Sequence, residues 1–238
     1  MSIEKTSYPL PHPAEFEKET LEFLKTFRFD HPKPSLNHIK AISQYFSRLP
    51  YENISKIIKY GQETDGNPFR LPDEITRDHY AWHLGGTCFS LTYFLAGIYT
   101  ILGYDAQALI CDLNWGANNH SAVMIRFDGQ SLLVDPGYMI YTPLPLIKES
   151  VRSRLSAETG IELRFLPETG SYSLYTYRNG QYTRRYQFID MAVPFSEFAK
   201  YWQASFDLPG MDDLTLTRVD GYEMTFIQGD FIKITSPT

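Results

Sequence analysis

The 238-residue chain has few cysteines and little positive charge. It contains two cysteines, and 22 Lys and Arg stand against 28 Asp and Glu, for a formal charge of −6. Two cysteines cannot build a disulfide scaffold, so we expect a reducing, cytoplasmic setting. An acidic chain without a basic run lacks the footprint that nucleic acids require. No apolar run reaches the roughly 20 residues that span a bilayer, and the first residues lack a signal-peptide core. We therefore expect neither nucleic-acid nor membrane partners.

Apolar and aromatic residues are what the sequence has in quantity. Hydrophobic residues make up 43% of the chain, including 17 Tyr and 16 Phe, which is enough to bury a large core. Helical periodicity dominates the first hundred residues, for example over 14–27, 36–47 and 73–82. A further run, 88–103, is apolar on nearly every face, which predicts a helix buried inside the core.

The second half of the chain has the apolar spacing of strands. The runs 106–113 and 120–127 predict two strands joined by the polar turn 114–119. Asp128-Gly129 then predicts a tight hairpin into a return strand. One more helix and several short strands follow. Helices first and strands afterwards are typical of an α+β fold, and strands joined by short turns pair antiparallel.

A glycine pair and a cysteine stand where the core helix begins. Gly85-Gly86-Thr87-Cys88 predicts a sharp turn that places the thiol at the N-terminal end of the helix. Exposed N–H groups and the helix dipole favour an anion there, which favours a reactive thiolate. The two glycines also leave room for a substrate to approach the sulfur. The alternative is a small buried cysteine without a chemical role.

Two further residues sit at matching places of the predicted hairpin. His120 opens the outgoing strand and Asp135 ends the returning strand, so both can lie at the same end. If the core helix packs on this sheet, Cys88 meets them at one edge. The three would then serve as nucleophile, base and orienting carboxylate. The alternative is that His120 belongs to a turn and that Asp135-Pro136-Gly137 is an ordinary turn sequence.

Six segments, in order, resemble the arylamine N-acetyltransferase family, which shares a Cys-His-Asp core with transglutaminases and papain-like enzymes. The resemblance covers about residues 15–235. The nucleophile motif of the family contains Gly-Gly-x-Cys, which this chain matches at Cys88. The six segments are 49–54 (LPYENI), 85–89 (GGTCF), 119–120 (NH), 133–138 (LVDPGY), 143–146 (PLPL) and 186–188 (YQF).

The resemblance implies a fold and a reaction. It implies a helical subdomain over 1–103 carrying the nucleophile, a β-barrel over 104–190 carrying the histidine and aspartate, and an α/β lid over 191–238, around a cysteine-proteinase-like core. It implies a ping-pong acyltransferase in which Cys88 takes an acetyl group from acetyl-CoA as a thioester. An arylamine or hydrazine then accepts the acetyl group, with His120 as the proton carrier.

The sequence departs from the family pattern beside the cysteine. Leu84 replaces the arginine before the glycine pair, and Ser90 replaces the glutamate two residues after Cys88. These changes leave two alternatives open. One is a thiol hydrolase or a transglutaminase-like, amide-forming enzyme on the same triad. The other is a family member that has lost activity.

Other side chains have both functional and ordinary interpretations. Tyr51, Trp115 and Tyr138 flank the triad motifs and are candidates for an aromatic acceptor pocket, with core packing as the alternative. Cys111 lies in an apolar strand and is expected to be a small core residue. The basic pair Arg184-Arg185 is a candidate contact for a CoA phosphate, with a solvated strand face as the favoured alternative.

One histidine pair has the spacing of a metal site. His79 and His83 stand four residues apart in a predicted helix, which can place both on one face. The glutamate that a metalloprotease motif needs is missing, and no convincing third ligand follows. We therefore predict no metal.

Overall fold

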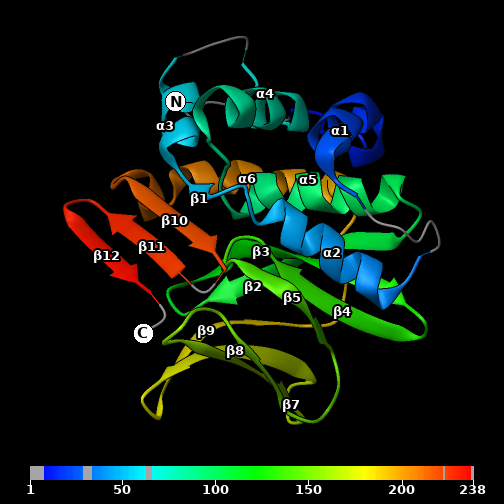
Figure 1. Ribbon diagram of the computed structural model, residues 1–238, viewed down its shortest axis with the longest axis vertical. Coiled ribbons are helices and arrows are strands. Elements are labelled where there is room, and N and C mark those ends of the chain that lie inside the picture. Colours follow the sequence, from blue (N-terminus) through cyan, green and yellow to red (C-terminus); the bar gives the residue numbers. More distant parts are fainter. Residues whose placement is uncertain (1–7, 29–33, 63–65, 222, 237–238) are drawn as a thin grey trace, which may run out of the picture.

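The computed structural model describes residues 8–28, 34–62, 66–221 and 223–236, and it is an α+β fold with helices above two sheets (Figure 1). Two helices have a clear local reason for their start: Ser35 caps α2 by accepting a hydrogen bond from the His38 N–H, and Pro72 begins α4. The first five helices are α1 (Glu17–Phe23), α2 (Leu36–Phe46), α3 (Ile54–Gly61), α4 (Pro72–Trp82) and α5 (Cys88–Ile101).

The core helix predicted from the apolar run is α5. Every side chain from Cys88 to Tyr99 is buried, because helices α1 and α4 cover one side of α5 and strands of the large sheet cover the other (Figure 1). None of the described helices has the length and apolarity needed to cross a bilayer. A helix enclosed in this way gives the cysteine at its first position a rigid support.

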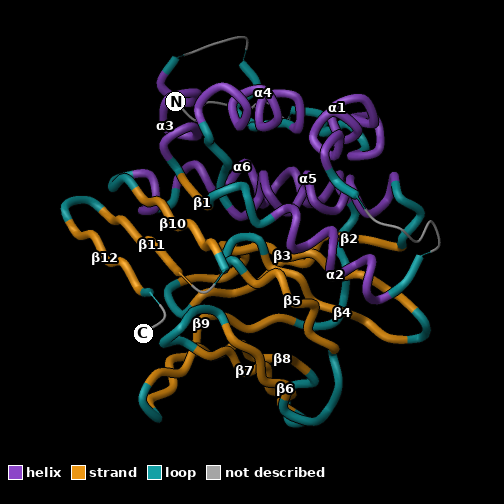
Figure 2. The backbone as a smooth tube through the Cα atoms, viewed as in Figure 1, coloured by secondary structure: helices purple, strands orange, loops and turns teal. Residues whose placement is uncertain are grey.

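Eight strands form one antiparallel, barrel-like sheet in the order β5-β4-β3-β2-β9-β8-β7-β6 (Figure 2). Neighbours along the chain pair directly, as the hairpin signals predict; only β2 and β9 join distant segments. The strands are β2 (Asp105–Leu113), β3 (Gly116–Phe127), β4 (Gln130–Asp135), β5 (Ile140–Pro145), β6 (Val151–Arg154), β7 (Gly160–Leu166), β8 (Ser171–Arg178) and β9 (Gln181–Phe188).

The last part of the chain forms a helix and a smaller sheet. Helix α6 (Phe195–Ala204) lies beside the start of α5: Trp202 stacks on Phe69, and Phe198 packs against Phe89. The smaller sheet has the order β1-β10-β11-β12 and takes its first strand from the helical part of the chain. Its strands are β1 (Tyr51–Glu52), β10 (Thr215–Asp220), β11 (Glu223–Gln228) and β12 (Phe231–Thr235).

The polar segment before His120 is mostly strand, not the turn that its composition predicts. Strand β3 already begins at Gly116, so His120 lies inside the strand and pairs with Cys111 on β2. Side chains satisfy the irregular backbone here, because Asn119 Oδ1 accepts a hydrogen bond from the Leu113 N–H at 2.9 Å. One of the polar side chains of residues 114–119 therefore forms a hydrogen bond with the backbone at the end of β2, and these polar residues do not mark a longer turn.

Candidate active site

The glycine turn before Cys88 is packed directly against the segment 49–54. A Cβ on Gly85 would lie 2.0 Å from the Pro50 carbonyl oxygen. Next to it, the Gly86 carbonyl accepts a hydrogen bond from the Glu52 N–H at 3.0 Å, and Tyr51 forms a parallel bridge with Gly86. Two of the segments that resemble the family are thus one structural unit that orients the start of α5.

Replacing Gly85 by alanine should destabilise the protein, because the new methyl group overlaps the Pro50 carbonyl. We expect the free energy of unfolding to fall by roughly 3 kcal/mol, measured by urea titration. Gly61→Ala is the matched control, since a Cβ there meets nothing within 4 Å, and its midpoint should stay the same or rise slightly. Equal midpoints for the two variants would contradict the close packing of the turn.

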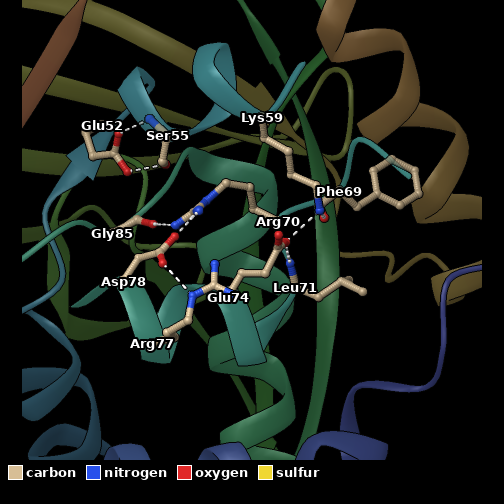
Figure 3. Close-up of polar contacts among 10 residues, drawn as sticks. All are labelled: Glu52, Ser55, Lys59, Phe69, Arg70, Leu71, Glu74, Arg77, Asp78 and Gly85. Atoms are coloured by element: carbon tan, nitrogen blue, oxygen red, sulfur yellow. Dashed lines mark hydrogen bonds and ion pairs between the residues drawn. The ribbon is translucent and has the colours of Figure 1, made fainter. Parts of the chain in front are cut away.

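A buried arginine holds the same turn from the other side (Figure 3). Arg70, in the segment before α4, donates a hydrogen bond to the Gly85 carbonyl at 3.3 Å and forms an ion pair with Asp78 at 2.5 Å. Asp78 also accepts a hydrogen bond from Arg77, and these partners lower its pKa against the opposing effect of burial. The chain that lacks an arginine at Leu84 thus supplies one to this turn from a different place in the sequence.

The segment 49–54 also ties the turn to the C-terminal part of the chain. The buried Glu52 carboxylate accepts hydrogen bonds from the N–H and hydroxyl of Ser55 at the start of α3 (Figure 3). The Asn53 amide donates to the carbonyls of Gly210 and Asp213 and accepts from the Thr215 N–H. The motif that resembles the family is therefore a junction between three parts of the fold.

Cys88 is the first residue of α5 and is 8% exposed. The side chain of the capping residue, Thr87, accepts no hydrogen bond from the first turn. The first-turn N–H groups therefore keep their capacity to bind a negatively charged or polarised oxygen. Ser90, at the position of the family's glutamate, instead donates from its hydroxyl to the Thr87 carbonyl at 3.1 Å.

His120 and Asp135 meet Cys88 around Gly137. The His120 Nε2 lies 2.9 Å from Asp135 Oδ2, and Asp135 Oδ1 accepts the Tyr138 N–H at 3.0 Å. Cys88 is close enough to His120 to raise the pKa of the imidazole. A Cβ on Gly137 would lie 2.6 Å from His120 Cε1 and 2.7 Å from Cys88 Cβ. The three residues that the sequence places on separate elements are therefore neighbours.

Electrostatics make the buried histidine a cation. Burial alone would lower the pKa of His120, but the charge and hydrogen bond of Asp135, together with the nearby Cys88, outweigh it and raise the pKa to about 10. The Asp135 carboxylate is fully buried and has His120 as its partner. At neutral pH the geometry therefore supports an imidazolium between a carboxylate and a sulfur.

A cavity of about 910 Å³ opens on Cys88 and His120. The three aromatic residues singled out in the sequence, Tyr51, Trp115 and Tyr138, all line it. Tyr138 packs edge-on against His120, with ring centroids 5.1 Å apart. Trp115 is 58% exposed at the turn between β2 and β3. The cavity therefore combines a thiol, a charged imidazole and flat apolar walls.

The cavity wall is cationic although the chain is acidic overall. Four basic residues line it, and the described lining residues include no Asp or Glu. Of the sequence pair 184–185, Arg185 lines the cavity, whereas Arg184 is exposed and bonds Asn114. The basic lining residues are Lys56, Arg178, Arg185 and Lys233. Arg178 and Lys233 both form ion pairs with Glu158, so the remaining positive charge of the wall comes from Lys56 and Arg185, and it favours anionic ligands.

The remaining candidates lie away from the cavity. Cys111 is fully buried in the apolar core of the large sheet, and burial together with nearby negative charge raises the pKa of its thiol. His79 is buried against Phe23, and His83 ends α4 in a left-handed conformation. The described residues contain no group of three or more His, Cys, Asp or Glu arranged to hold a metal ion.

A thiol at the start of a buried helix, facing an antiparallel barrel across a cavity, is the arrangement of enzymes that act through a cysteine. The sequence model of the N-acetyltransferase family matches residues 35–216, more than half of the chain. The chain therefore belongs to the arylamine N-acetyltransferase family, and it is a transferase of acetyl groups. No curated protein is significantly similar to it in sequence.

Solved arylamine N-acetyltransferases have the same fold. The enzyme from Mycobacterium abscessus matches with a TM-score of 0.77 at 14% identity, covering 97% of this chain and 86% of its own. The Mycobacterium marinum enzyme in complex with CoA has a TM-score of 0.74 at 17% identity, covering 92% and 83%. An enzyme from Bacillus cereus, described with a Cys-His-Glu catalytic triad, has a TM-score of 0.69 at 18% identity, covering 93% and 91%.

Proposed function

We propose that this chain transfers an acetyl group from acetyl-CoA to an arylamine or hydrazine through a thioester on Cys88. The observation that carries the proposal is the contact of Cys88 with His120, and of His120 with Asp135, at the wall of one cavity. The imidazolium of His120 favours the nucleophilic thiolate form of Cys88. The buried carboxylate orients the imidazole and stabilises its charge.

In the first half-reaction the Cys88 sulfur attacks the acetyl carbonyl and the bond to the CoA sulfur breaks. His120 gives its proton to the departing CoA thiolate. The N–H groups at the start of α5, including that of Cys88, stabilise the oxyanion. In the second half-reaction the amine attacks the thioester, His120 takes the proton of the amine, and the Cys88 thiolate is released with the amide.

The cationic rim of the cavity supports a phosphate-bearing donor. Arg178, Arg185 and Lys233 come from β8, β9 and β12, so two sheets contribute cations to one opening. Arg178 and Lys233 share the carboxylate of Glu158, which leaves a net positive charge among these groups. The pyrophosphate and ribose phosphate of CoA are the anions of acetyl-CoA, and cations of this kind bind them. The aromatic residues Tyr51, Trp115 and Tyr138 supply flat contacts for an aromatic acceptor.

The test is the intact mass of the protein after incubation with acetyl-CoA in the absence of an acceptor. We expect a gain of one acetyl group that peptide mapping assigns to Cys88 and that an arylamine removes. Protein first alkylated with iodoacetamide should gain none, because Cys88 is accessible from the cavity whereas Cys111 is fully buried. If Cys88 reacts with iodoacetamide but takes no acetyl group, acetyl-CoA is not the donor. If Cys88 reacts with neither reagent, the chain is better explained as a family member that has lost activity.

A further inference from the structure

Lys56 is a buried cation in the wall of the active-site cavity. It lies on α3, is 7% exposed, and donates two hydrogen bonds of 2.9 Å from Nζ to the carbonyl and hydroxyl oxygens of Ser205. The ring of Phe206 lies 4.3 Å from Nζ. Lys56 and Ser205 both line the cavity that Cys88 lines. The ammonium group of Lys56 is thus fixed by uncharged partners, the oxygens of Ser205 and the ring of Phe206.

The positive charge of Lys56 is incompletely compensated. An ammonium has three N–H donors, two are used by Ser205, and no carboxylate among the described residues bonds it. By contrast, Lys59, on the same helix, forms an ion pair with Glu74 at 2.6 Å (Figure 3). A buried cation without an anionic partner is costly, and a ligand carboxylate in the cavity would supply the missing partner.

Lys56 is still charged at neutral pH. Burial lowers its pKa to about 8, against a smaller raising effect of Cys88. The other titratable side chains on the elements around Lys56 include Arg70, which lines a small void beside it, and Asp207, exposed after α6. They also include Tyr60, which stacks on Phe206, Tyr51, which lines the same cavity, and the buried Glu52, which bonds Ser55. Among described groups, Cys88 is the one that acts on Lys56 electrostatically. The cation is therefore within electrostatic range of the reacting sulfur.

We propose that Lys56 forms a carboxylate-binding subsite of the cavity, so that the enzyme favours small substrates that carry a carboxylate close to the reacting group. The subsite rests on the proposed acyl transfer at Cys88. It differs from the rim cations in burial, because Lys56 is 7% exposed whereas the side chains of Lys233 and Arg178 are 34% and 46% exposed. The carboxylate can enter on the acceptor amine or on the acyl group of the donor.

Two pairs of probes of matched shape distinguish these sources. For the acceptor, kcat/KM is compared for 4-aminobenzoate and 4-aminobenzamide with acetyl-CoA as donor. For the acyl group, the rate of acyl-enzyme formation is compared for malonyl-CoA and isovaleryl-CoA, whose branched acyl group has a similar shape and no charge. We expect Lys56→Met to reduce the preference for the carboxylate in one of the two pairs by about tenfold or more, the effect of one charge-assisted hydrogen bond.

The controls separate the subsite from general effects. Lys200→Met removes the same charge from an exposed lysine on α6 outside the cavity, and both ratios should stay at wild-type values. In the wild type, the affected ratio should fall as pH rises from 7 to 9.5, because Lys56 loses its proton while the probe carboxylates stay ionised. The protonation of Cys88 and His120 also changes with pH, but it affects both members of a probe pair equally and therefore cancels in the ratio.

The outcomes are distinct. A folded Lys56→Met variant with both ratios within twofold of wild type overturns the subsite. If the variant does not fold, a wild-type ratio that is flat between pH 7 and 9.5 overturns it instead. Failure of any donor to acylate Cys88 contradicts the proposed function, whereas acylation with unchanged ratios contradicts the role of Lys56 alone.

Discussion

Replacing Cys88 by alanine should lower the rate of acetyl transfer by on the order of 10⁴-fold or more, because no other thiol can form the acyl-enzyme. The only other cysteine, Cys111, lies in the core of the large sheet with no exposed surface. Alanine removes one sulfur atom from the first position of α5 and leaves the helix intact. The measurement is steady-state transfer from acetyl-CoA to an arylamine, with circular dichroism to verify the fold.

Cys111→Ala is the matched control for this prediction. The two cysteines are close enough to act on each other electrostatically, yet the raised pKa of Cys111 keeps it protonated at neutral pH. The variant should lose about 1 kcal/mol of stability from the small cavity that it creates and keep transfer within a few-fold of wild type. Activity that survives in Cys88→Ala and disappears in Cys111→Ala would reverse the roles that we propose.

Much of the fold could be predicted because its signals are local. The helix α5 follows from an apolar run with a glycine pair before it, and the β3–β4 hairpin follows from Asp128-Gly129. The hairpin brings the chain back beside its start, which is why His120 and Asp135 could be placed together without knowledge of the rest of the fold. Local patterns therefore placed His120 beside Asp135, whereas the approach of Cys88 depends on the packing of α5 against the large sheet.

What could not be predicted depends on contacts between distant segments. Strand β1 is two residues long and exists because β10, more than 160 residues away, pairs with it. Arg70 reaches Gly85, and Lys56 reaches Ser205, only after the helices and the C-terminal part of the chain have packed. Neither basic residue belongs to a sequence motif that would single it out.

Replacing Asp135 by asparagine should lower transfer by about 10⁴-fold while leaving the cysteine and histidine in place. The reason is the pattern of hydrogen bonds around the carboxylate. Oδ1 accepts the Tyr138 N–H, so the oxygen of an asparagine would stay there and its NH₂ group would face His120 Nε2. Nε2 would then have to accept, which moves the imidazole proton to Nδ1 and removes the charged form of His120.

The expected signature is a loss of Cys88 reactivity toward iodoacetamide at neutral pH that parallels the loss of transfer. Without the Asp135 carboxylate, burial is the dominant effect on the pKa of His120 and lowers it, so the imidazolium no longer stabilises a thiolate. Asp128→Asn is the control at the opposite end of the same hairpin, where a positive φ of 50° suits asparagine, and it should leave both rates unchanged. Full activity in Asp135→Asn would show that His120 works without an orienting carboxylate, and the triad would reduce to a Cys–His pair.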